Sequence, residues 1–138
     1  MPRDLTVRFR VDFGRQCSIG IGKIELLEGI ARSGSLSEAA RQMRMSYRRA
    51  WLLLADLNTS FDEAVARAST GGRGGGGAVL TPFGERLIAG YRKMESGLQP
   101  LAATYFHAFG KRVKAARSPA KSKKAVPVGS IKRKASAH

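Results

Sequence analysis

The stretch from Ser35 to Phe61 constrains the fold most, because it carries two helix signals separated by only a short bend. In the first, Ser35 precedes Glu38 by three residues, which is the spacing of a capping box. The apolar residues that follow have the i, i+3, i+4, i+7 spacing of one helix face. They are Leu36, Ala39, Ala40 and Met43.

The second signal begins after the bend at Arg44 and Met45, where Ser46 is a favourable N-cap residue. Its apolar stripe again has helical spacing and consists of Ala50, Leu53, Leu54, Leu57 and Phe61. The first helix is rich in alanine, so the two helices can pack closely. Two helices that meet at so short a turn predict a helix-turn-helix.

The residues on the N-terminal side predict a strand, a turn and a helix. Apolar and polar residues alternate from Leu5 to Phe13, which is typical of a half-buried strand. The glycine-flanked segment 16–22 is expected to form a turn. A helix is then expected from about Ile21 to Ser33, with Gly34 as its stop signal.

The residues on the C-terminal side predict a β-hairpin and a long helix. Short strands are expected at 64–69 and 78–81, and six of the seven residues from 71 to 77 between them are glycine. Thr81 is the expected N-cap of the last helix, with Pro82 at its first position and Glu85 in its first turn.

This order of elements predicts a fold class that is mainly α with a small β wing. We expect a winged helix-turn-helix over residues 1–109, with a long C-terminal dimerisation helix, followed by a disordered basic tail over residues 110–138. Lys and Arg alternate in the tail with small residues and Pro, and such a segment cannot build a core.

The long helix carries a heptad seam, which suggests a homodimer. Packing of the helix on its own domain explains the spacing equally well. Pro100 is expected to kink this helix or to split it. The seam residues are Leu87, Tyr91, Met94, Leu98, Leu101 and Tyr105.

The net charge is +15, and the residues from Gly110 onward include ten basic and no acidic ones. A polyanion is therefore the expected partner, either nucleic acid or an anionic membrane surface. No apolar stretch is long enough to span a membrane, and no signal-peptide core precedes the domain. The single cysteine, Cys17, fits a reducing compartment, so we expect the cytoplasm, at the nucleoid.

The first turn of the second helix is expected to enter the major groove of double-stranded DNA. The expected DNA-binding residues lie off its apolar stripe, together with one arginine in the glycine loop. A guanidinium can donate two hydrogen bonds to guanine, although two adjacent arginines could also form a solvated face. These residues are Ser46, Tyr47, Arg48, Arg49, Leu52 and Arg73. Trp51, in contrast, is expected to pack at the rim of the core.

The glycine loop has three interpretations. A nucleotide-binding P-loop is excluded because no Lys-Ser or Lys-Thr pair follows the glycines. A passive flexible hairpin is one remaining alternative. A wing, whose backbone approaches phosphates while Arg73 enters a minor groove, fits the preceding helix-turn-helix better.

No pattern of catalytic residues is present. The two histidines, His107 and His138, have no nearby cysteine or carboxylate pattern suited to a metal. Glu25 and Glu28 are one helical turn apart, as on an ordinary solvent-facing surface. We therefore expect a protein that is not an enzyme, with no cofactor and no metal.

The segments GSLSEAARQMRMSYRRAW and STGGRGGGGAVLTPFGERLI resemble the N-terminal DNA-binding domain of the ModE family of molybdate-responsive transcriptional regulators. The helix-turn-helix also resembles the wider LysR-type group. The resemblance runs from about Ile21 to Tyr105 and implies a symmetric dimer on a two-fold operator. Full-length members continue into a molybdate-binding domain, which we do not expect in this chain, because a basic tail follows instead.

Three functions follow from these observations. The first is a sequence-specific regulator of transcription. The second is a nucleoid-associated protein that coats DNA non-specifically through its basic tail. The third is a protein-interaction module in which the wing or the tail binds an acidic partner.

Overall fold

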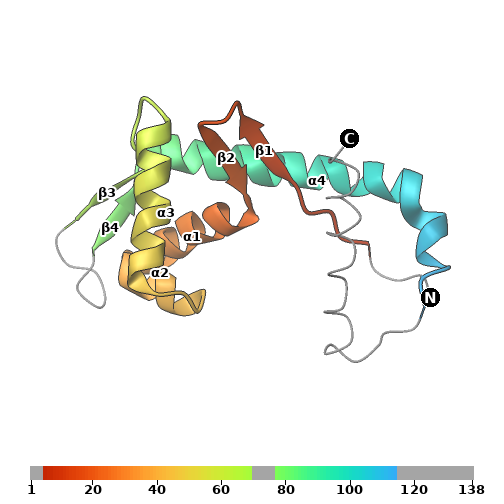
Figure 1. Cartoon of the computed structure of the whole chain (residues 1–138), viewed down its shortest axis with the longest axis horizontal. Helices are drawn as coiled ribbons and strands as arrows, with labels where there is room; N and C mark the ends of the chain where they lie inside the picture. Colours follow the sequence, from red (N-terminus) through yellow and green to blue (C-terminus); the bar gives the residue numbers. More distant parts are fainter. Residues whose placement is uncertain (1–4, 70–76, 115–138) are drawn as a thin grey trace, which may run out of the picture. The chain divides into compact units, whose positions relative to one another are not determined.

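The computed structural model describes residues 5–69 and 77–114 of the chain. The chain divides into two compact units, one of which is Leu5–Tyr105. The other combines Met1–Asp4 with Phe106–His138, and the structure describes its residues 106–114. Within the first unit the elements follow the expected order of a winged helix-turn-helix (Figure 1).

An antiparallel hairpin opens the fold. It pairs β1, Arg10–Phe13, with β2, Cys17–Gly20. The expected strand over residues 5–13 is therefore too long, and the expected turn over residues 16–22 is wrong. Cys17 and Ile19 are buried and alternate with half-buried residues, so this segment packs as a strand on the core.

Residues 5–9 contact the long helix α4 instead of continuing the strand. The Phe9 and Tyr91 rings stack with centroids 4.3 Å apart, and the Tyr91 hydroxyl donates a 3.0 Å hydrogen bond to the Phe9 carbonyl. Gln99 accepts from the Val7 amide at 3.2 Å and donates to the Leu5 carbonyl. The Gln99 amide thus satisfies backbone groups that a second strand would otherwise pair.

Helix α1, Ile21–Ser33, is the central element of the core. Four of its apolar residues are inaccessible to solvent, and the helix contacts α2, α3, β2 and β4. Gly34 follows α1 with φ +71°, the left-handed conformation in which glycine is favoured at the end of a helix. The fully buried residues of α1 are Ile24, Leu26, Leu27 and Ile30.

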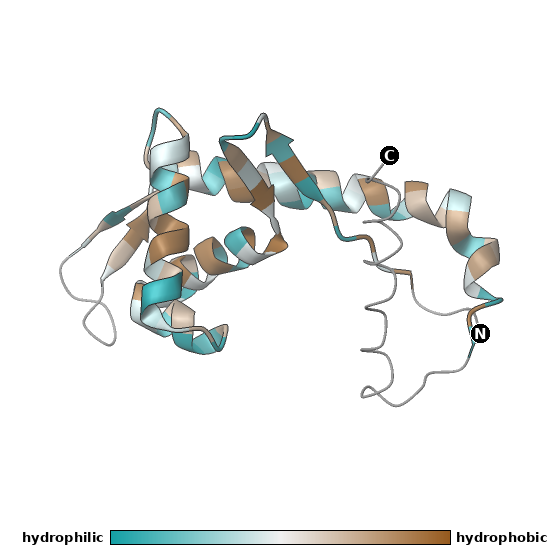
Figure 2. Cartoon of the chain, viewed as in Figure 1, coloured by the Kyte–Doolittle hydropathy of each residue, from teal (hydrophilic) through white to brown (hydrophobic). Residues whose placement is uncertain are grey.

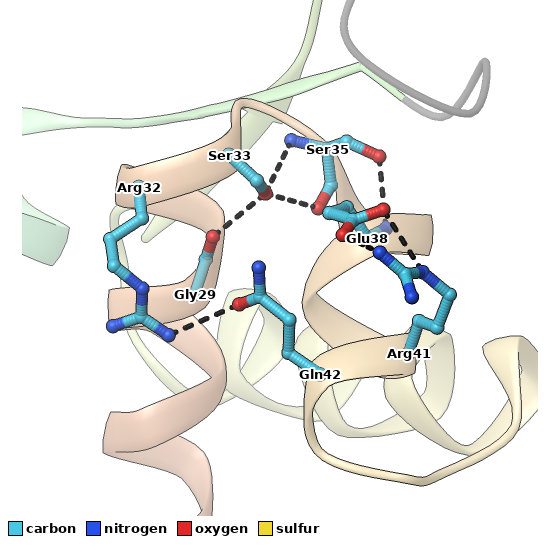
Figure 3. Close-up of polar contacts among 7 residues, drawn as sticks. All are labelled: Gly29, Arg32, Ser33, Ser35, Glu38, Arg41 and Gln42. Atoms are coloured by element: carbon cyan, nitrogen blue, oxygen red, sulfur yellow. Dashed lines mark hydrogen bonds and ion pairs between the residues drawn. The ribbon is translucent and has the colours of Figure 1, made fainter.

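A network of serine hydroxyls fixes the corner between α1 and α2, Leu36–Gln42 (Figure 3). The buried Ser35 hydroxyl accepts a 3.1 Å hydrogen bond from the Glu38 amide, as the capping box predicted. The Ser33 hydroxyl donates to the Gly29 carbonyl at 2.8 Å. Gly29 also lets the helices approach closely, because a Cβ there would lie 3.0 Å from the Cβ of Ala39.

Helix α3, Tyr47–Ser60, lies across α1 and α2 and buries Ala50 and Leu57. The other apolar residues of its expected stripe, Leu53 and Leu54, are partly buried against the same core. Phe61, the last stripe residue, lies just beyond the helix at its C-cap.

The wing strands are β3, Ala66–Ala68, and β4, Ala78–Leu80, which pair antiparallel. Both are shorter than the sequence predicted. Residues 70–76, which include Arg73 and most of the expected glycine loop, lie outside the described residues. The wing is therefore described at its base only.

Helix α4, Pro82–Gly110, begins at the predicted N-cap. The Thr81 hydroxyl accepts from the Gly84 amide at 3.0 Å and donates to the Ala64 carbonyl at 2.6 Å. Pro100 does not split the helix. Pro100 has no amide hydrogen to donate to the Ser96 carbonyl one turn earlier. Ser96 is exposed, so water can bond to this carbonyl instead.

The heptad seam of α4 divides into two parts. Leu87 and Tyr91 pack on the core of their own domain. Further along, Met94, Leu101 and Tyr105 are exposed. The seam therefore serves intramolecular packing in its first part and leaves apolar side chains on the surface in its second.

An ion-pair network links α4 to α1. The Arg92 guanidinium donates to both carboxylate oxygens of Glu28, at 2.7 and 2.9 Å, and to Glu95 at 2.8 Å. The hydrogen bond from Arg92 lowers the pKa of Glu28, despite partial burial, and the Glu28 hydrogen bond in turn raises the pKa of Arg92. The pair is bidentate, a geometry that favours a defined orientation.

We expect Gly84→Ala to destabilise the domain by about 2–4 kcal/mol. A Cβ at Gly84 would lie 2.1 Å from the Val65 carbonyl oxygen, so α4 would have to move away from the wing base. The matched control is Gly90→Ala on the same helix, where a Cβ has open space and should stabilise by about 0.5–1 kcal/mol. Urea unfolding measures both, and equal midpoints for the two variants would contradict the packing described.

We expect Glu28→Gln to cost about 0.5–1 kcal/mol of unfolding free energy at neutral pH, because the pair is partly exposed. The pKa of Glu28 is lower in the folded state, so its contribution is present above the ordinary value of about 4.3 and is lost as pH falls through the lowered value. Unfolding measured from about pH 7 to about pH 3 should therefore bring variant and wild type together at the acid end. Glu25→Gln, at an exposed position of the same helix, is the matched control and should cost less than Glu28→Gln at neutral pH.

Candidate nucleic-acid interface

The turn between α2 and α3 sets the orientation of the second helix. The Met45 amide donates to the Ala40 carbonyl at 3.0 Å, and the Arg44 amide donates to the Arg41 carbonyl at 3.1 Å. Met45 is partly buried against the core. The chain thus closes α2 and reaches the N-cap of α3 within a few residues.

Ser46 caps α3 as predicted. Its hydroxyl oxygen accepts a 3.0 Å hydrogen bond from the Arg49 amide, so the first turn of the helix is fixed. The Ser46 hydroxyl hydrogen remains available as a donor. Helix α3 contains no acidic residue in its first turn.

The predicted contact residues of α3 are all exposed on the surface. Tyr47 and Leu52 are each 49% exposed, and Arg48 and Arg49 are also exposed. In the described part of the chain no carboxylate pairs with either arginine side chain. These two guanidinium groups are therefore available to a ligand.

The prediction for Trp51 is wrong. Its side chain is 52% exposed and does not belong to the hydrophobic core. At helical spacing Trp51 lies between the buried stripe and the exposed arginines, so periodicity alone could not decide its environment. Trp51 thus extends the exposed face of α3 beside Tyr47.

The charge around the turn is strongly positive. Between Glu38 and Asp56 the chain contains four arginines and no acidic residue. In Figure 2 hydrophilic colour marks parts of α2 and the start of α3. Arg41 is paired with Glu38, whose hydrogen bond raises the pKa of Arg41. The other three arginines are Arg44, Arg48 and Arg49.

An open groove runs along the arginine side of α3 toward α1. At its far end the Lys23 ammonium pairs with Asp56 at 2.8 Å and donates to the Ser18 carbonyl at 2.9 Å. The groove carries apolar, basic and acidic side chains. Its lining consists of Lys23, Ser46, Arg48, Arg49, Leu52, Leu53 and Asp56.

The base of the wing is held against the helix-turn-helix. Asn58 of α3 accepts from the Val65 amide at 2.7 Å and donates to the Ala66 carbonyl at 3.2 Å. On the other strand, the Ala78 amide donates to the Gly34 carbonyl at 3.0 Å. The wing base is therefore positioned by both α3 and the α1–α2 corner.

Arg67 of β3 is exposed and was not predicted as a site residue. Its position between two alanines of a short strand was the available signal, because a lone basic residue there points away from the buried Ala66. Arg73, which was predicted, lies outside the described residues.

Neither a metal site nor a membrane span is found within residues 5–69 and 77–114. No group of three or more His, Cys, Asp or Glu side chains could hold a metal ion there. None of the helices described is both long enough and apolar enough to cross a bilayer.

Comparison with known proteins agrees with this geometry. Residues 21–85 match the family model of bacterial regulatory helix-turn-helix proteins of the lysR family. The chain is 42% identical over 87 residues to the molybdenum-pterin-binding protein MopB of Rhodobacter capsulatus, which covers 63% of this chain and 32% of MopB.

Similarity also extends to proteins named ModE. Identity is 46% over 69 residues to the transcriptional regulator ModE of Yersinia pestis, and 45% over 69 residues to the DNA-binding transcriptional dual regulator ModE of Escherichia coli K12. Each match covers 50% of this chain and 26% of the relative. The chain thus spans about a third or less of the length of these relatives. Residues 21–85 form a LysR-type helix-turn-helix domain, and the N-terminal part of the chain is homologous to the regulators named ModE and to the molybdenum-pterin-binding protein MopB.

Proposed function

We propose that this chain is a sequence-specific, DNA-binding regulator of transcription that reads the major groove with the first turns of α3. The observation that carries the proposal is the pair of exposed arginines, Arg48 and Arg49, that follows the Ser46 cap and that no carboxylate of the described residues pairs with. In a helix-turn-helix, residues at this end of the second helix reach base edges. Tyr47 and Leu52 are exposed beside them and complete the proposed reading surface.

The proposed wing contact comes from residues around β3 and β4. Arg67 is an exposed cation at the wing base, and we assign Arg73 to the same role from its place in the glycine loop. Glycines allow a backbone to approach phosphates closely. MopB is named for molybdenum-pterin binding and the ModE protein of Escherichia coli for DNA binding; we propose only DNA binding for this chain.

The test is selection of binding sites from a random duplex pool, with the full chain as the bait. We expect wild type to enrich one sequence pattern and Arg48→Ala/Arg49→Ala to lose preference at the bases these residues read. Each bidentate contact contributes about 1–3 kcal/mol of discrimination, which corresponds to about 5–150-fold at that base pair.

The matched control is Arg8→Ala/Arg15→Ala, which removes the same charge from exposed residues of the N-terminal segment. It should keep the wild-type pattern. Unchanged base preference in the α3 variant would contradict the proposal. Equal wild-type affinity for all sequences would instead favour a non-specific, nucleoid-associated protein that acts through the basic tail.

We also propose that the chain acts as a homodimer through α4. The exposed seam residues Met94, Leu101 and Tyr105 support this proposal, because they expose large apolar side chains along one helix. Apolar surfaces of this kind are typical of regions covered by a partner.

For the dimer we expect Leu101→Asp to shift the wild-type sedimentation profile toward the monomer. A buried, unpaired carboxylate in an apolar interface is strongly unfavourable. Ala89→Asp, at an exposed position of α4 off the seam, is the matched control and should sediment like wild type. A monomeric wild type at micromolar concentration would contradict the dimer without affecting the DNA-binding proposal.

A further inference from the structure

We propose that Arg44, in the turn between α2 and α3, contacts a phosphate of the DNA backbone. The inference rests on the proposed function and adds a contact residue that the helix periodicity did not assign. The backbone conformation of Arg44 is unusual. Arg44 has φ +57°, and no other non-glycine residue among those described has a positive φ.

The left-handed conformation at Arg44 is imposed by its neighbours. The amides of Arg44 and Met45 both donate back to carbonyls of α2, which closes the helix. Met45 is then partly buried in the core, and Ser46 reaches its capping position on α3. The chain can make all of these contacts within this short turn because residue 44 reverses its direction.

Glycine is the residue that such a position favours, because a Cβ disfavours positive φ. This chain follows that preference elsewhere: Gly34, directly after α1, is also left-handed, with φ +71°. At Arg44 the chain keeps a long, charged side chain in a conformation that costs folding free energy. Strain of this kind is typically retained where the side chain contributes to function.

Among the described residues, the Arg44 side chain has no ion pair or hydrogen bond that would offset this strain. It is exposed, and none of the ion pairs or side-chain hydrogen bonds within residues 5–69 and 77–114 involves it. Its neighbour Arg41, in contrast, is held by Glu38. The guanidinium of Arg44 is thus free to bind a ligand from outside the chain.

The position of the turn identifies that ligand as a phosphate group. Only Met45 and Ser46 separate Arg44 from the first residue of α3. When the start of a second helix enters the major groove, the preceding helix and turn face the DNA backbone. A guanidinium there binds phosphate oxygens through charge-assisted hydrogen bonds and carries no base preference.

The experiment compares Arg44→Gly with wild type in two measurements, thermal unfolding and DNA binding as a function of salt. We expect Arg44→Gly to raise the Tm by about 4 °C, because it relieves the left-handed strain. We expect its affinity to fall by about tenfold for operator and random duplexes alike. The log–log salt slope should become shallower by about 0.9 for each subunit bound.

Two further variants at residue 44 separate the effect of charge from the effect of backbone strain. Arg44→Asn tolerates positive φ but lacks the charge, so it should bind as weakly as Arg44→Gly. Arg44→Lys keeps the charge and should retain most of the affinity and the salt slope. Arg15→Ala removes an exposed arginine from the β1–β2 turn and should leave DNA affinity unchanged.

The outcomes separate this inference from the proposed function. Unchanged affinity in Arg44→Gly, or a lower Tm, overturns the role of Arg44. If Arg48→Ala/Arg49→Ala loses base preference in the same assays, the proposed function stands without it. A wild-type chain that binds no DNA overturns both.

Discussion

Burial of α1 is the constraint on which the rest of the domain depends. Four of its apolar side chains have no solvent exposure, so this helix cannot exist without the elements that cover it. The helices α2 and α3 and the strands β2 and β4 all contact it. The exposed face of α3 therefore has its orientation because its opposite face packs on α1, together with α2. If α3 reads DNA as proposed, a helix supported in this way should lose little conformational entropy on binding.

Close approaches of small residues and satisfied polar groups fix the geometry around that core. Gly29 lets Ala39 approach α1 closely, and Gly84 lets the Val65 carbonyl approach α4 closely. Side chains of serine, threonine and asparagine pair with the backbone at each corner, at Ser35, Thr81 and Asn58. Within the described part of the chain no buried side-chain nitrogen or oxygen lacks a partner. Backbone groups at helix ends and strand ends are thereby satisfied without long connecting loops.

Charge divides the surface according to role. Two acidic residues are paired with cations of another element, Glu28 with Arg92 and Asp56 with Lys23. The arginines around the α2–α3 turn are different, because within residues 5–69 and 77–114 only Arg41 among them has a carboxylate partner. A carboxylate within reach thus separates the cations that link elements from the arginines proposed to bind DNA. At Arg44 a backbone conformation that favours glycine strengthens the same distinction.

The sequence alone determined the helices, their caps and the helix-turn-helix. Helical spacing, Ser35, Ser46 and Thr81 are local signals, because a capping bond or an amphipathic stripe spans only a few residues. The exposure of Arg48 and Arg49 followed from the same stripe. Local alternation was less informative at the N-terminus, where β2 was missed and residues 5–9 were assigned to a strand.

Tertiary contacts decided what local patterns left open. Gln99 and Tyr91, far away in the sequence, hold residues 5–9 and end the strand pairing. The heptad seam of α4 fitted both inward packing and a dimer, and the domain core covers only its first part. Trp51 lies on the surface although periodicity put it near the core. In each case the outcome depends on which distant surface is available. The spacing of apolar residues along one element does not show which other elements pack against it.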